Sequence, residues 1–213
     1  MALTNGEKMF ALGVSYDQVD PNNFNNLLDK FKKRIEWWYI KPGEDLRQFE
    51  YSGFIVMGIS CIIIDTLCGY RYGINDNTPN RFIPGNTIRS DFISFCKEYF
   101  PKLKKSLPIN CQSKYQELQG KAYADVLYES YRCKILHESR IPYYGGISED
   151  IELIDYDDIS GWILINPHAL LQETKAVLDK FINQIKTRKY ENEFKKRFRF
   201  VFNDIDTSVW GRL

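Results

Sequence analysis

An uncharged, strongly apolar segment constrains the fold of this chain more than any other feature. The stretch of fourteen residues from Tyr51 to Ile64 contains no charged side chain, and Asp65 follows it. A helix of that length is too short to cross a bilayer, and an apolar surface on every side is typical of a helix enclosed by others. We therefore predict a buried central helix from about Phe49 to Tyr70 in the middle of a helical bundle.

Helical periodicity elsewhere predicts a mainly α fold, a bundle of four to five helices. Asp20 and Pro21 resemble an N-cap followed by a proline at the first helical position, and the apolar stripe that follows is Phe24, Leu27, Leu28, Phe31, Ile35 and Trp38. This first helix is predicted to end near Lys41-Pro42-Gly43. A loop rich in Asn, Pro and Gly is predicted over Gly73 to Asn86. Further helices are predicted from Asn86 or Thr87 to before Pro101, from about Ser113 to Glu138, and from Asn166-Pro167 onward.

The period changes once along the chain. Ile151 to Asp155 and Trp162 to Ile165 are short β-type runs around the turn Asp157 to Gly161, a pattern that predicts a small hairpin. The whole chain, 1–213, then forms one domain, with a bundle core at about 21–202 and the hairpin inserted at about 147–165, before the last long helix.

Composition narrows the class of protein without naming a function. The formal net charge of +1 argues neither for nor against nucleic acid, so only local patches of charge are informative. The number of cysteines is odd, and the sequence contains no C-x-x-C motif. Both features favour a reducing, cytoplasmic compartment. The N-terminus shows no signal-peptide pattern. Short metal-ligand spacings are missing, so we expect no metal and no cofactor. The cysteines are Cys61, Cys68, Cys96, Cys111 and Cys133.

Arg132 and His137 are the residues best suited to chemistry. The chain has only two histidines, and this one follows an arginine by five positions near a predicted helix end. A guanidinium is always charged and binds phosphate bidentately, while an imidazole moves protons near neutral pH. The pair therefore indicates work on a phosphodiester, and RNA supplies its own nucleophile, the 2′-OH.

Helix geometry limits how these two side chains can meet. Five residues place them roughly 140° apart around a helix, so in one straight helix they should not point at one atom. They could converge if the helix frays after Leu136, or across a symmetric dimer in which two copies of the helix line one cleft. We favour the dimer, which would combine two arginines and two histidines.

The motif resembles that of the HEPN superfamily (higher eukaryotes and prokaryotes nucleotide-binding). Arg-x-x-x-x-His at the end of a helix in a four- or five-helix bundle carries the resemblance, which is specific only over Leu127 to Ile141. Many HEPN proteins are metal-independent endoribonucleases that act as dimers in toxin–antitoxin, abortive-infection or CRISPR-linked systems. The flanks look most like those of bacterial defence and plasmid-borne groups.

The resemblance implies roles for both residues. Arg132 would bind and polarise the scissile phosphate, and His137 would act as general acid–base or position the 2′-OH. Internal attack would leave a 2′,3′-cyclic phosphate and a 5′-hydroxyl. Cys133 departs from the family, which often has Asn, Asp or His directly after the arginine.

Neighbours of the motif are candidates for substrate binding. Tyr128 could stack on a base, although a packing aromatic is as plausible. Lys134 and Arg140 could steer phosphate or be ordinary surface charges, and Glu138 could pair with Arg132 or be a solvated carboxylate, which we favour. His168 is interpreted as structural, and the acidic residues of the hairpin as a solvated turn. The basic, aromatic tail Lys186 to Arg199 could bind nucleic acid, but a solvated face with a core stripe is favoured.

The leading hypothesis is a cytoplasmic, dimeric HEPN-type endoribonuclease with RNA as substrate and an antitoxin or defence-system protein as a possible partner. The alternative is a non-catalytic HEPN-like module for dimerisation or for protein or RNA binding, which Cys133 favours. A third hypothesis is a nucleotide-binding or nucleotidyltransferase-partner domain. No Gly-rich phosphate loop is present in the sequence, so any nucleotide would have to bind at Arg132.

Overall fold

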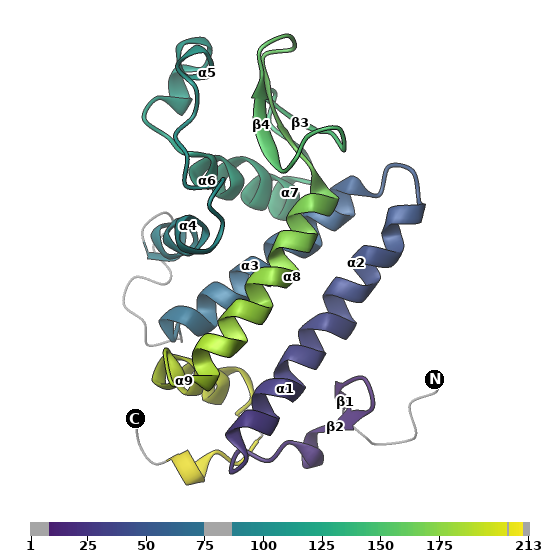
Figure 1. The fold of residues 1–213 in the computed structure, drawn as a ribbon, viewed down its shortest axis with the longest axis vertical. Coiled ribbons are helices and arrows are strands. Elements are labelled where there is room, and N and C mark those ends of the chain that lie inside the picture. The colour runs from purple at the N-terminus through teal and green to yellow at the C-terminus, as the bar shows by residue number, and fades with distance from the viewer. Residues whose placement is uncertain (1–8, 75–86, 204, 211–213) are drawn as a thin grey trace.

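A computed structural model describes residues 9–74, 87–203 and 205–210 and is mainly helical, with two small sheets (Figure 1). Helix α3, Gly53–Tyr72, is its centre: it contacts α8, Pro167–Lys186, which crosses it in Figure 1, and also contacts α4, α7 and α9. Most of its side chains are buried, because its surface is apolar on nearly every side and hydrophobic burial drives helix packing. The predicted central helix is confirmed.

The length argument against a membrane span is wrong for α3. The helix has 20 residues, and among the described helices it is the one long and apolar enough to cross a membrane by length and composition. Within the fold, 61% of its most apolar window is buried.

The first helix begins and ends later than predicted. It begins at Phe24, with the Asn23 side chain accepting from the Asn26 N–H, so Asn23 and not Asp20 is the N-cap. Helix α1, Phe24–Ile35, continues through a π-helical turn, Glu36–Ile40, into α2, Lys41–Asp45. Pro42 does not end the helix, because it lies at the first positions after the wider π turn, where a missing N–H is tolerated. Trp38, predicted in the apolar stripe, is exposed.

The third predicted helix is confirmed as α4, Thr87–Tyr99. It buries Phe92, Phe95 and Cys96 in the core. The preceding loop, predicted for Gly73 to Asn86, lies outside the described residues except for Gly73 and Ile74. Gly73 ends α3 in the left-handed conformation that favours glycine.

The helix predicted over Ser113 to Glu138 is wrong as one element. The chain forms a short α5, Ile109–Lys114, and turns at Gly120, whose φ of +71° favours glycine. A continuous helix starts only at α6, Tyr123–Val126, and proceeds through a π-helical turn, Leu127–Arg132, into α7, Cys133–Glu138. Ion pairs from Arg89 and Lys121 to Glu129 hold the π turn against its neighbours.

The predicted hairpin is confirmed, although its first strand lies later than expected. Strands β4, Ile154–Asp157, and β5, Trp162–Ile165, pair antiparallel. The structure adds β3, Gly145–Ile147, parallel to β5, which gives the order β3-β5-β4. A second sheet, β1, Met9–Ala11, with β2, Val14–Ser15, was not predicted.

The basic C-terminal segment packs inward through its aromatic residues. Helix α9, Glu191–Val201, buries Phe194 and Phe198 completely. The ammonium of Lys195 pairs with Glu191 and lies over the ring of Phe24. The apolar stripe of this segment therefore packs into the core, as the favoured interpretation predicted. The ammonium of Lys195 is already paired within the fold.

Substituting Gly161 should test how tightly the hairpin turn is built. Gly161 has a φ of +71°, and a Cβ there would lie 1.8 Å from Nζ of Lys114. Gly161→Ala should lower the free energy of unfolding by about 1–3 kcal/mol, from backbone strain and from displacement of Lys114. Gly120→Ala, with the same φ and open space around it, should lose only the backbone part. Urea denaturation measures both, and equal losses would contradict the steric contribution of Lys114.

Candidate functional site

Arg132 lies at the end of the π turn, where it is held from a distant part of the chain. Its Nη2 donates to Oδ2 of Asp65 on α3 at 2.9 Å, and the two side chains are 15% and 34% exposed. The wider π turn redirects side chains from the α-helical path, and such turns are frequent at functional sites. Asp65 thus fixes the guanidinium at the surface junction of α3 and α7.

His137 meets Arg132 in the same chain. Nη1 of the arginine lies 3.4 Å from Nε2 of the imidazole. The two side chains, which we expected to point apart in one straight helix, therefore lie close together within one chain. The angle separates their Cα atoms, but the long arginine side chain reaches along the helix toward the histidine. The helix ends directly after the pair, with Ser139 in the left-handed conformation.

The chemistry of the guanidinium limits this contact. A guanidinium has only donors, so the contact is a hydrogen bond only in the tautomer that leaves Nε2 of His137 free to accept. An imidazole is also the side chain most often used to transfer protons in catalysis.

Charge and burial define what the guanidinium can bind. Burial alone would lower the pKa of Arg132, but the carboxylate of Asp65 raises that pKa well above its ordinary value, so the arginine is permanently charged. Its Nε is buried and has no hydrogen-bond partner among the described residues. An unsatisfied buried donor is costly.

Two neighbours complete the surroundings of Arg132. Sγ of Cys133 lies 3.9 Å from Nη1, a weak contact that a thiol tolerates. The guanidinium carbon lies 5.4 Å from the ring centroid of Tyr128, within cation–π range. Burial raises the pKa of the Tyr128 hydroxyl, so it stays protonated. The ring of Tyr128 therefore packs against both the Arg132 guanidinium and the ring of Phe92.

The other predicted substrate-binding residues form a separate cluster. Glu138 pairs with Lys134 at 2.6 Å and with Arg140 at 2.5 Å, and these hydrogen bonds lower the pKa of its carboxyl. Glu138 does not pair with Arg132, whose partner is Asp65. Lys134 and Arg140 flank the motif as predicted, but each is matched by the same carboxylate.

His168, interpreted from the sequence as structural, lies away from Arg132 and His137 on another helix. It is buried in the first turn of α8, with Nε2 3.3 Å from Oε1 of Glu149.

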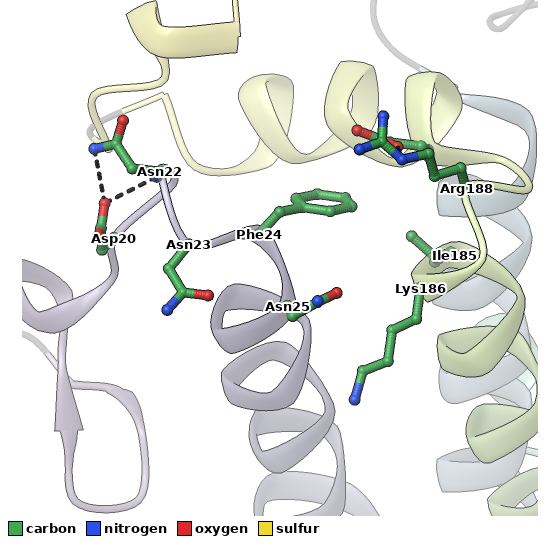
Figure 2. A pocket seen from close by; sticks show the side chains of 9 residues that line it. Asp20, Asn22, Asn23, Phe24, Asn25, Ile185, Lys186 and Arg188 are labelled. Carbon is green, nitrogen blue, oxygen red and sulfur yellow. Dashed lines mark hydrogen bonds and ion pairs between the residues drawn. The ribbon is translucent and has the colours of Figure 1, made fainter.

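A hollow lies elsewhere, between the start of α1 and the turn after α8 (Figure 2). It measures about 630 Å³ and is lined by the Asn22, Asn23 and Asn25 side chains and by two cations. Lys186 pairs with Asp29 at 2.7 Å, and Arg188 lies 4.0 Å from Glu191. With carboxylates beside both cations, this hollow has little net charge to attract an anion.

Asp65 was missed as a site residue, although the sequence carries a signal for it. It is the one charged residue between Tyr51 and Tyr70. A carboxylate in an otherwise apolar helix needs a partner. The sequence does not indicate that this partner is Arg132, because 67 positions separate the two residues.

Removing the charge of Asp65 should destabilise the protein. Asp65→Asn keeps an acceptor for Nη2 but leaves the half-buried guanidinium without a counter-charge. We expect the free energy of unfolding to fall by about 1–2 kcal/mol, measured by urea denaturation. Asp45→Asn breaks the exposed Lys41–Asp45 pair and should change stability by less than about 0.5 kcal/mol. Equal effects would show that Asp65 is an ordinary surface charge.

No group of three His, Cys, Asp or Glu side chains that could hold a metal ion occurs in the described ranges. Comparisons with models of protein families, with curated proteins and with solved structures find no significant match.

Proposed function

We propose that this protein is a metal-independent endoribonuclease of the HEPN type, with Arg132 and His137 as catalytic residues. One observation carries the proposal: a permanently charged guanidinium with an unsatisfied Nε lies 3.4 Å from Nε2 of a histidine. A cationic group and an imidazole thus lie side by side.

The proposed reaction uses both residues. His137 takes the proton of the 2′-OH, and the 2′-oxygen bonds to phosphorus as the bond from phosphorus to the 5′-oxygen breaks. The leaving 5′-oxygen takes a proton from solvent, so the products are a 2′,3′-cyclic phosphate and a 5′-hydroxyl. Arg132 stabilises the charge on the phosphoryl oxygens, while Asp65 keeps the guanidinium in place.

A second copy of the chain is part of the proposal. On α3, Ile55, Gly58, Ile62 and Asp65 recur at helical spacing. Ile55 and Ile62 are exposed, and a Cβ at Gly58 would lie 4.0 Å from Cδ2 of Leu136, which is also exposed. These side chains form an apolar strip (Ile55, Ile62 and Leu136) that leads to the Arg132–His137 pair. A two-fold contact along it would bury the strip and bring two sites together.

A charge on this strip should separate the copies. Ile62→Glu is expected to convert a dimer to a monomer, because burying an unpaired carboxylate at an apolar contact is unfavourable, and RNA cleavage should fall with dimer content. Sedimentation velocity measures the change. Ile109→Glu, at an exposed isoleucine on α5, should leave the dimer intact. A dimer that survives Ile62→Glu would place the interface elsewhere.

The second candidate is a non-catalytic dimerisation or RNA-binding module. The observation that favours it is the Asp65–Arg132 ion pair, which already compensates the guanidinium. In either case the resemblance favours a cytoplasmic protein of toxin or anti-phage defence, with a cognate antitoxin or defence-system partner.

The experiment that separates the candidates is incubation of the folded protein with a mixed RNA pool in EDTA. Cleavage by the wild type, lost in Arg132→Ala and His137→Ala, is expected of the enzyme. Binding without cleavage is expected of the module.

A further inference from the structure

The small sheet has an outer face that is partly exposed. Strand β5 reads Trp-Ile-Leu-Ile, an apolar run typical of a strand buried on both faces. Ile163 and Ile165 are fully buried against the bundle, as expected of one face. Trp162, on the other face, is 47% exposed, and Leu164 beside it is only half-buried.

This outer face is built flat. Gly146 on β3 pairs with Leu164, and a Cβ at Gly146 would lie 2.7 Å from Cδ2 of Leu164 and 3.3 Å from Cε3 of Trp162. The two apolar side chains therefore lie across the bare glycine and form a continuous surface. Asp155 and Asp157 pair with Leu164 and Trp162 across β4, so carboxylates border the apolar surface on the same face.

The surface is also held in shape. The Asp157 carboxylate accepts from the N–H groups of Ile159 and Ser160, and the Tyr115 hydroxyl donates to the carbonyl of Gly161 at 2.7 Å. Ile159, at the tip of this ordered turn, is 97% exposed. A surface that needs no rearrangement loses little entropy when it is covered.

Charge decides which partner can cover it. Residues 149–158 contain six carboxylates, and residues 148–166 contain no Lys, Arg or His. Nζ of Lys102 forms an ion pair with Oε2 of Glu152 at 3.0 Å. Among the described residues, Asp150, Asp155 and Asp158 form no ion pair with a Lys or Arg. Phosphates of RNA would be repelled, and a two-fold contact with a second copy would oppose like charges.

We propose that the outer face of the sheet, centred on Trp162, Leu164 and Gly146, is a docking site for a cationic amphipathic helix of a different protein. The apolar stripe of that helix covers Trp162 and Leu164, and its Lys or Arg residues meet Asp155, Asp150 and Asp158. This contact uses none of the residues of the Arg132–His137 site.

A synthetic peptide tests the proposal. The probe is a fluorescent amphipathic helix of Leu and Lys, and the control peptide has Glu in place of every Lys. The wild type should bind the Lys peptide, more weakly at high salt, and should not bind the Glu peptide. Trp162→Gln should weaken binding by about tenfold or more, as loss of a central aromatic anchor does. Trp37→Gln, at a tryptophan that is 44% exposed on the π turn before α2, should change it little.

Four results would overturn the proposal: no binding of the Lys peptide, equal binding of the Glu peptide, equal losses in the two tryptophan variants, or conversion of a dimer to a monomer by Trp162→Gln. RNA cleavage by Trp162→Gln should equal that of the wild type, so failure of this proposal is distinguishable from failure of the proposed nuclease.

Discussion

RNA cleavage by Arg132→Lys is expected to be about a thousandfold slower than by the wild type, with the fold retained. Lysine keeps the positive charge and can still pair with Asp65, so the α3–α7 junction stays neutralised. It cannot present two parallel donors to a phosphate, and a single point charge stabilises the developing charge less well. Single-turnover rates on one RNA measure the effect, with circular dichroism as the check of the fold.

Arg140→Lys is the matched control for this variant. Arg140 is an exposed arginine of the same segment, paired with Glu138, and its replacement should change the rate by less than about threefold. Arg132→Lys with a rate close to the wild type would show that the arginine acts through charge alone, against the bidentate role.

His137→Gln is expected to lower the rate by roughly a hundredfold to ten thousandfold, the usual contribution of general acid–base catalysis. The amide oxygen of glutamine can still accept from Nη1 of Arg132, so the local packing is preserved, but glutamine cannot carry a proton. Single-turnover rates on one RNA measure the loss.

His168→Gln provides the control, because His168 is the other histidine and is buried against Glu149. It should keep the rate of the wild type. A His137→Gln rate close to that of the wild type would show that another group is the base.

The helices were predictable where burial imposes a period. The apolar run of α3 and the Asn166-Pro167 start of α8 are both set by local sequence, through hydrophobic contact and capping. Strand β3 was not predictable, because Gly145 and Gly146 are equally typical of a turn. They form a strand here because β5 lies beside them.

The candidate site was predictable in its residue types and not in its geometry. The π turn at Leu127–Arg132 has no composition signal, so the direction of Arg132 could not be derived from helical spacing. Its ion pair with Asp65 joins residues far apart in the chain, a contact that only the packing of α7 on α3 creates. The sequence therefore favoured a contact between copies, where the structure has a contact within one.

The chemistry of the new RNA ends tests whether the protein is a metal-independent endoribonuclease. The folded protein is incubated in EDTA with an RNA that it cleaves and with the same RNA carrying a single 2′-deoxy nucleotide at the cleavage position. We expect a 2′,3′-cyclic phosphate and a 5′-hydroxyl from the first RNA, and an intact second RNA at that position. Cleavage of the 2′-deoxy position, a 5′-phosphate product, or intact RNA in both samples would contradict it.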